Sequence, residues 1–343
     1  MRMNNIEIPK LNEKIYSNIE NNWLNMKKPA HSLGKIEKII SQYGAMINKE
    51  PTEELKSAMI LTCGDHGFAK YGVSAYPPEV TVQMIKGYIK GTAAATVLAN
   101  HCNADVFISD IGVNADLSDL AKVHNLKVAY GTNDFTVGPA MTKKQAIDGI
   151  KSGMKIANMC MDKGYNMLIT GEMGIGNTTS TAAIASAAFD LEPEKTVGRG
   201  SGINDERMKI KRDVVSKGLK VNKPDKNDGL DILAKVGGYD HAGLVGAIIA
   251  GAMRRVPTMV DGVNATAAAL LAYKIYPESA NYMLCSHLSE EISHKKMLEE
   301  MNLKPIVDAG MCLGEGTGAS LAIVIMQAGL NVYNKLKNDV DSL

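Results

Sequence analysis

Seven short apolar runs recur along this chain, and each is followed by a longer segment whose apolar residues have helical spacing. Short apolar runs between polar or glycine-rich segments are typical of strands that are buried on both faces. They occupy residues 58–62, 106–109, 128–130, 167–170, 258–260, 282–285 and 305–307. Their alternation with helices predicts an α/β fold, in which helices flank a parallel sheet.

Three of the helical segments have clear boundaries. The apolar spacing after Glu79 predicts one helix, and the alanine-rich stretch from Ser180 to Phe189 predicts another. Asn204 can cap a third, which two acidic residues open and which we expect to end near Gly218. Residues 1–50 contain helical patterns around Trp23 and no strand pattern, so we expect a separate small helical element there, joined by the C-terminal helix.

Charge and cysteine content exclude several classes of protein. The 343 residues include 38 basic and 37 acidic side chains, and a net charge of +1 provides no general attraction to nucleic acid or to an anionic membrane. Five cysteines without C-x-x-C spacing indicate neither a disulfide framework nor a zinc knuckle. No apolar stretch reaches the roughly 18 residues of a membrane span, and no signal peptide is apparent, so we expect a cytoplasmic protein.

Glycine is concentrated where predicted strands meet predicted helices. The chain has 32 glycines, and five junctions are especially rich in them: residues 64–67, 171–176, 198–202, 237–238 and 314–318. In open α/β sheets, ligands bind at the carboxyl ends of the strands, where such loops lie. These junctions are therefore the candidate site.

The run from Gly171 to Thr179 carries the strongest local signal. Its glycines allow a ligand to approach the backbone, and its amides and hydroxyls open a helix, which favours a phosphate. Dinucleotide binding fits less well, because Thr179 stands where a G-x-G-x-x-G motif needs its third glycine. No Walker A motif is present, which disfavours an ATPase. A tight turn without a ligand is the simpler alternative.

Two acidic residues lie among these glycines. Glu315 stands between Gly314 and Gly316, and Glu172 follows Gly171. A carboxylate in such a place costs desolvation energy unless it has a use, and small neighbours leave room for a ligand ring. We expect the two carboxylates to face one cleft, with an ordinary surface-loop acid as the alternative.

Other candidates have more ordinary explanations. The spacing of His287, Glu290, Glu291 and His294 fits no known zinc motif, so we predict no metal site. His66 after Asp65 could transfer a proton or could simply anchor its loop by a hydrogen bond. Lys211 could reach back toward a phosphate or could be an ordinary solvated lysine.

Together these motifs resemble the nicotinate mononucleotide:dimethylbenzimidazole phosphoribosyltransferase family, which makes the lower-ligand nucleotide of cobamides. The resemblance covers nearly the whole chain and rests on residues 28–29 with 32–34, 65–67, 72–77, 79–81 with 83–84, 171–179, 261–262, 286–287 and 313–319. It implies a Rossmann-like parallel sheet. It also implies a small helical domain of residues 1–50 with about 331–343, a catalytic domain of residues 51–330, and a dimer of identical or paralogous chains with its site near the interface.

The resemblance also implies roles for individual residues. Glu315 resembles the family's general base, and Glu172 resembles a second acid beside the leaving pyridine. The residues similar to the nucleotide and phosphate contacts are Gly174, Gly176, Asn177, Thr178, Thr179, Gly200, Gly202 and Lys211. Those similar to the aromatic-base pocket are Ser74, Tyr76, Gln83 and Leu313.

Three positions depart from the family pattern. His31 stands where the family usually has glycine, Asp240 with His241 replaces Glu-Ile, and Cys312 replaces an arginine before the Leu313 motif. The absence of that arginine changes the electrostatic surroundings of Glu315. A branch of the family that uses phenols and pairs unlike paralogous chains would keep the same motifs, so both types of acceptor remain open.

The expected reaction moves ribose 5-phosphate from nicotinate mononucleotide to a benzimidazole or a phenol. The pyridinium leaves without needing a proton, so one carboxylate to deprotonate the acceptor is enough and no metal or redox cofactor is required. Two rival functions remain. One is a weakly active or inactive paralogue that serves as a nucleotide-binding partner subunit, and the other is an NAD-type oxidoreductase.

Overall fold

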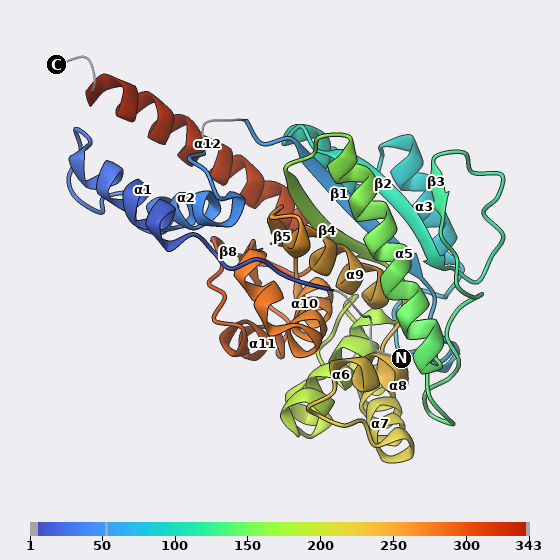
Figure 1. Ribbon diagram of the computed structural model, residues 1–343. Helices are drawn as coiled ribbons and strands as arrows, with labels where there is room; N and C mark the ends of the chain where they lie inside the picture. The colour runs from blue at the N-terminus through green and yellow to red at the C-terminus, as the bar shows by residue number, and fades with distance from the viewer. Residues whose placement is uncertain (1–5, 52–53, 341–343) are drawn as a thin grey trace.

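A six-stranded parallel sheet forms the centre of the molecule (Figure 1). The computed structural model describes residues 6–51 and 54–340. The strand order is β3-β2-β1-β4-β5-β6, which is the doubly wound order, so the predicted α/β class is confirmed. The strands are β1 (Ser57–Gly64), β2 (Asp105–Gly112), β3 (Val123–Asn125), β4 (Met167–Met173), β5 (Thr258–Val260) and β6 (Met283–Cys285). β7 (His287–Ser289) and β8 (Val307–Met311) form a separate parallel pair.

Helices cover both faces of the sheet. α3, α4 and α12 contact one face, and α5 and α9 contact the other. The helices are α1 (Glu13–Asn25), α2 (Lys35–Ile47), α3 (Val80–Lys90), α4 (Ala94–His101), α5 (Lys143–Asp162), α6 (Asn177–Phe189), α7 (Asp205–Asn222), α8 (Gly229–Val236), α9 (Tyr239–Met253), α10 (Val263–Ile275), α11 (His294–Glu300) and α12 (Thr317–Val340). Three short 3-10 turns lie at Ala69–Tyr71, Pro193–Lys195 and Pro277–Tyr282.

Strand β1 shows why its sequence is a continuous apolar run. All eight of its residues are buried. Met59, Leu61 and Cys63 pack toward α3, α4 and α12, whereas Ala58 and Ile60 pack toward α5 and α9. Because successive side chains of a strand point to opposite faces, a strand covered on both sides needs apolar residues at every position.

Glycines allow α5 and α9 to pack in close contact. A Cβ atom built on Gly153 of α5 would lie 1.8 Å from the carbonyl oxygen of Gly243. A Cβ on Gly246 of α9 would lie 1.9 Å from the carbonyl oxygen of Ile150. The two backbones therefore touch at this crossing, and α9 is buried along nearly its whole length.

The N-terminal helices α1 and α2 pack against α12, although they are about 300 residues away in sequence (Figure 1). Trp23 makes an edge contact with Tyr333, with ring centroids 4.9 Å apart. The Tyr333 hydroxyl donates to Glu50, which also pairs with Lys337. Trp23 is therefore an apolar anchor in this part of the molecule.

Three predicted segments need correction. Residues 128–130 form a bend and not a strand, and the edge strand is β3, five residues earlier. The strand predicted at 305–307 lies at Val307–Met311 and belongs to the small second sheet. Helix α7 continues through Gly218 to Asn222, because that glycine serves close packing: a Cβ there would lie 2.4 Å from the Phe135 ring.

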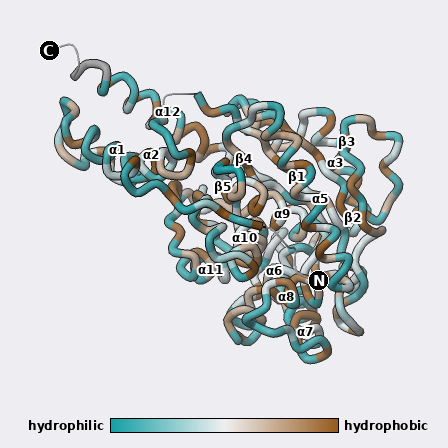
Figure 2. Tube along the Cα trace, viewed as in Figure 1, coloured by the Kyte–Doolittle hydropathy of each residue, from teal (hydrophilic) through white to brown (hydrophobic). Residues whose placement is uncertain are grey.

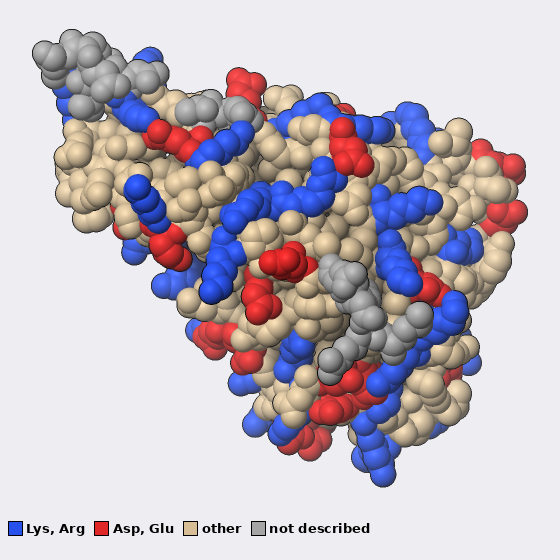
Figure 3. Space-filling model, in the orientation of Figure 1, with Lys and Arg blue, Asp and Glu red and all other residues tan. Residues whose placement is uncertain are grey.

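The face of the molecule seen in Figures 2 and 3 carries no single dominant charge. Figure 2 shows short hydrophobic stretches alternating with hydrophilic ones along the outer helices, and Figure 3 shows basic and acidic side chains intermixed over the visible face. Within the described residues, no helix is both long enough and apolar enough to cross a bilayer.

Candidate active site

A cavity of about 660 Å³ lies at the carboxyl end of β4, where the strand order of the sheet reverses. Loops after β4, β5 and β8, together with residues 200–202, form its wall. Eleven of the fourteen residues proposed from the sequence line it, namely Ser74, Tyr76, Glu172, Gly174, Gly176, Asn177, Thr178, Gly200, Gly202, Leu313 and Glu315.

Contacts with β1 and α3 fix the position of the loop from Gly174 to Asn177. A Cβ on Gly174 would lie 2.1 Å from the Gly64 carbonyl oxygen, so only glycine fits there. The backbone N–H of Ile175 donates to the Thr81 hydroxyl, which itself donates to Asp65. Asp65 is thus a structural anchor that ties the β1 loop and α3 to the start of α6.

One corner of the cavity, here called the phosphate corner, carries groups of the kind that bind phosphates in other proteins. The Lys211 ammonium is fully buried and donates to the Thr178 hydroxyl at 2.8 Å and to the Gly198 carbonyl at 3.0 Å. Burial lowers the pKa of Lys211 to about 8, although nearby Glu291 opposes this shift. Glu291 also accepts the Gly200 N–H at 2.7 Å. An anion in this corner would meet a helix N-terminus and the Thr178 hydroxyl, with the Lys211 ammonium one layer behind.

Glu172 lies at the end of β4 and is almost completely buried. It accepts hydrogen bonds from the Asn177 amide and, at 3.3 Å, from the backbone N–H of Glu315. Burial raises the pKa of Glu172 well above its usual range, and the charges of Asp240 and Asp261 raise it further. The surroundings of this carboxyl group therefore favour its protonated form more than water does.

Glu315 lies in the tight loop between β8 and α12. Its φ is +60°, and the glycines on both sides have φ of +85°. A Cβ on Gly314 would lie 2.8 Å from a carboxyl oxygen of Glu172, so the loop sits directly on the other acid. Burial raises the pKa of Glu315, and the charge of Asp261 raises it further, while the nearby Tyr88 hydroxyl partly offsets both effects.

Asp261 holds this loop in position. Its two carboxyl oxygens accept the backbone N–H groups of Gly316 and Ala319, each at 2.9 Å. It is completely buried at the end of β5. Asp261 belongs to one of the motifs that carry the family resemblance, but no role for it is predicted from the sequence. The amides that it binds lie more than 50 residues away along the chain, so this contact is visible only in the fold.

The apolar end of the cavity is formed by Tyr76, Leu313, Val80 and Met84. Tyr76 and Leu313 are 55% and 54% exposed, so this end is open in the single chain. The Ser74 hydroxyl lies 3.1 Å from that of Ser201, which connects this end to the loop that carries Gly200 and Gly202.

The remaining three proposed residues do not line the cavity. Lys211 lies one layer behind Thr178. Thr179 is buried, and its hydroxyl has no hydrogen-bond partner within the described part of the chain. Gln83 is exposed, since the side of α3 that faces the cavity carries Val80 and Met84. The binding and catalytic roles of all fourteen residues stay predictions.

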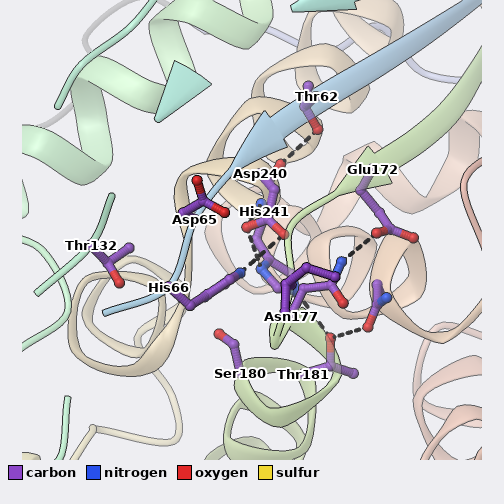
Figure 4. A network of polar contacts seen from close by, with 12 residues as sticks. Thr62, Asp65, His66, Thr132, Glu172, Asn177, Ser180, Thr181, Asp240 and His241 are labelled. Carbon is purple, nitrogen blue, oxygen red and sulfur yellow. Dashed lines mark hydrogen bonds and ion pairs between the residues drawn. The ribbon is translucent and has the colours of Figure 1, made fainter. Parts of the chain in front are cut away.

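A buried polar network lies directly behind the cavity (Figure 4). Asp240 lies 3.3 Å from His66 and 3.1 Å from His241. Burial alone would raise the pKa of Asp240, but the two histidines lower it well below its usual range. Potential metal-binding atoms of these three residues lie within 4.8 Å of one another. Their mutual hydrogen bonds account for the cluster, and the sequence predicts no metal here.

The other histidine cluster does not converge on one point. His294 bonds the Thr266 hydroxyl and the backbone N–H of Ser289, and His287 bonds the Ser286 hydroxyl. Glu291 instead turns to the phosphate corner. From the sequence, Glu291 is a candidate only as a metal ligand, and its place at the phosphate corner is not predicted. Its proximity to the Ser286 motif is the only signal in the sequence for that place.

The site combines a corner for a phosphate with two carboxyl groups and an apolar end of suitable size for an aromatic ring. A cavity of this kind can hold a phosphorylated sugar while the sugar is transferred from one aromatic ring to another. The fold and the site thus define a glycosyl-transferring enzyme of the phosphoribosyltransferase class.

Comparison with known proteins identifies the family. Residues 8–341 match a family model described as phosphoribosyltransferase, and the chain belongs to this family. It is 42% identical over 311 residues to the nicotinate-nucleotide–dimethylbenzimidazole phosphoribosyltransferase of Chloroflexus aggregans, covering 91% of this chain and 88% of that one. It is 40% identical over 312 residues to the enzyme of the same name from Geobacter metallireducens, with the same shares covered.

A solved structure agrees with these relatives. The CobT protein of Thermus thermophilus is 34% identical and superposes with a TM-score of 0.89, over 93% of this chain and 96% of that one. The chain is therefore an enzyme of the nicotinate-nucleotide:dimethylbenzimidazole phosphoribosyltransferase family, as the motifs in its sequence predicted.

Proposed function

We propose that this chain transfers the 5-phosphoribosyl group of nicotinate mononucleotide to an aromatic base, giving an α-ribosyl nucleotide for the lower ligand of a cobamide. One observation carries the proposal. Glu172 and Glu315 both line the cavity between the phosphate corner and the apolar end, and the backbone N–H of Glu315 donates a hydrogen bond to the Glu172 carboxyl group. The names of the relatives support the same donor and acceptor.

In the proposed reaction, the bond between the sugar's anomeric carbon and the pyridinium nitrogen breaks. Its electron pair returns to the ring, so nicotinate leaves without taking up a proton. The acceptor nitrogen or oxygen forms the new bond from the opposite face, which turns a β linkage into an α linkage. The proton that the acceptor loses goes to Glu315.

The two carboxyl groups suit different tasks. Glu315 is only partly buried at the cavity wall, so it can ionise and accept a proton. Burial raises the pKa of Glu172, and the charges of Asp240 and Asp261 raise it further. In its protonated form Glu172 can donate a hydrogen bond to the carboxylate of the leaving ring. Environments that push the pKa values of two acids apart are a common basis for such a division of roles.

The acceptor can be a benzimidazole or a phenol. Cys312 is exposed at the cavity and carries no positive side chain, so charge at this position does not select between the two acceptors. The presence of both carboxyl groups in the cavity favours a catalytic chain over an inactive partner subunit.

A product assay tests the proposal directly. The purified chain is incubated with nicotinate mononucleotide and with either dimethylbenzimidazole or a phenol, and products are followed by chromatography and mass spectrometry. We expect equal amounts of nicotinate and α-ribosyl nucleotide. Binding without turnover, restored only by a second paralogous chain, would support the partner-subunit alternative, and hydride transfer would support an oxidoreductase.

A further inference from the structure

The network behind the cavity continues to a residue in the cavity wall. Asp240, in the first turn of α9, contacts His241, and Nε2 of His241 lies 3.0 Å from the Thr181 hydroxyl. The Thr181 hydroxyl in turn donates to Oδ1 of Asn264 at 2.8 Å. Asn264 lies in the first turn of α10 and lines the cavity.

Hydrogen counting gives this chain of contacts a direction. A threonine hydroxyl has one proton, and Thr181 uses it on Asn264, so Nε2 of His241 must carry the hydrogen between those two groups. The other ring nitrogen faces the Asp240 carboxylate, which only accepts. The histidine thus donates to Thr181 from Nε2, while its Nδ1 pairs with Asp240.

The contact with Thr181 also defines the orientation of the Asn264 side chain. Its oxygen is occupied by Thr181, so its NH₂ group is the part left to face the cavity. Within the described residues, this NH₂ group makes no hydrogen bond of its own. Thr181 lies one turn beyond Thr178 on the same side of α6, which places Asn264 next to the phosphate corner.

We propose that Asn264 binds the nucleotide, donating from Nδ2 to an oxygen of its ribose phosphate, and that Thr181 and His241 hold the amide in the donating orientation. The acceptor is either a ribose hydroxyl or a phosphate oxygen. His241 is one of the residues that depart from the family pattern, so this support is a specific feature of the chain. The inference rests on the proposed function, because it takes nicotinate mononucleotide as the ligand.

The first test measures nucleotide binding by calorimetry for Asn264→Ala. We expect the Kd for nicotinate mononucleotide to rise about 3- to 10-fold if the partner is a ribose hydroxyl, and about 10- to 100-fold if it is a charged phosphate oxygen. Nicotinate riboside, which lacks the phosphate, separates these sources, since only loss of a ribose contact weakens its binding too. An unchanged Kd in a variant with normal thermal unfolding would overturn the proposal.

The second test concerns orientation. Thr181→Val keeps the shape of the side chain but frees the amide, so we expect the Kd to rise several-fold. In the double variant with Asn264→Ala, Thr181→Val should have no further effect on the Kd. If Thr181 had only a structural role, its effect on the Kd would persist in the double variant. Ser180→Ala is the matched control, because the neighbouring hydroxyl bonds the Val236 carbonyl and should leave the Kd unchanged.

The outcomes also separate this inference from the proposed function. Additive losses for Thr181→Val and Asn264→Ala would refute the orienting role. If the wild-type chain fails to bind or turn over nicotinate mononucleotide, the proposed function itself is wrong. If it binds and reacts normally while both variants match it, only the inference about Asn264 is wrong.

Discussion

Lys211 illustrates how the fold changes the surroundings of a lysine side chain. On a solvated helix face its ammonium would stay charged well above neutral pH. Here it is enclosed by Thr178 and Gly198, and burial lowers its pKa to about 8. A bound phosphate would favour the charged form of this ammonium, so nucleotide binding and the protonation of Lys211 are coupled.

That coupling predicts a pH dependence. Above about pH 8 the free enzyme loses the Lys211 charge, so kcat/KM for nicotinate mononucleotide should fall as the pH rises. In Lys211→Gln the value should be low throughout and this alkaline decline should disappear. Steady-state kinetics between about pH 6 and about pH 10 check this, and an unchanged decline in the variant would assign it to another group.

Some residues of the site could be predicted from sequence and others could not. Glu172 and Glu315 stand out because each lies among glycines at a junction, which is a local signal. Glu291 and Asn264 carry no such signal, since their partners Gly200 and Thr181 lie 91 and 83 residues away along the chain. Only the folded structure brings such pairs together.

At the scale of elements, backbone contact between α5 and α9 holds the layer over β1, β2 and β4. Neither helix has a side chain between the backbones where Gly153 meets Gly243. Interiors are close-packed, so even one methyl group inserted there must displace a helix.

We therefore expect Gly153→Ala to lower the free energy of unfolding by about 1 to 3 kcal/mol or more. Gly138→Ala is the matched control, because a Cβ there meets no atom within 4 Å and should change stability by less than about 0.5 kcal/mol. Thermal or denaturant unfolding measures both. Equal stability of the two variants would mean that the helices separate easily and that the contact is unimportant.

The elements predicted correctly are those with a strong local pattern. The continuous apolar runs of β1 and β4 and the cap of α7 at Asn204 were visible in the sequence. The edge strand was misplaced, because it has three residues with little burial, whereas the more apolar bend after it also bonds to β2. The predicted end of α7 at Gly218 was wrong for another reason, because this glycine makes room for the Phe135 ring and does not end the helix.

For the whole molecule, α1, α2 and α12 form a group that projects from the sheet (Figure 1). The division into residues 1–50 with 331–343 and residues 51–330 stays a prediction. Its boundary at 331 falls within α12, and residues 341–343 lie outside the described part of the chain.

Near the cavity, the exposed Tyr76 and Leu313 leave the apolar end open to water.

A partner subunit would close that end, so we predict that the chain pairs with itself or with a paralogous chain. Burying two such side chains favours association, because each contributes apolar area. Light scattering coupled to size exclusion should show a dimer at assay concentration, for the chain alone or for the mixture of paralogues. A monomer with full activity would contradict this prediction.

The central claim is that Glu315 takes the proton of the attacking base, and turnover by Glu315→Gln tests it most directly. Glutamine keeps the size of the side chain but cannot accept the proton, so we expect turnover to fall about 100-fold or more while nicotinate mononucleotide still binds. The wild-type rate should also rise with pH through the raised pKa of Glu315, and the variant should lose that dependence. The loss should be larger with a phenol than with a benzimidazole, whose unprotonated nitrogen can attack first. Near-normal turnover with both acceptors would contradict the account and move the role of base to Glu172 or His66.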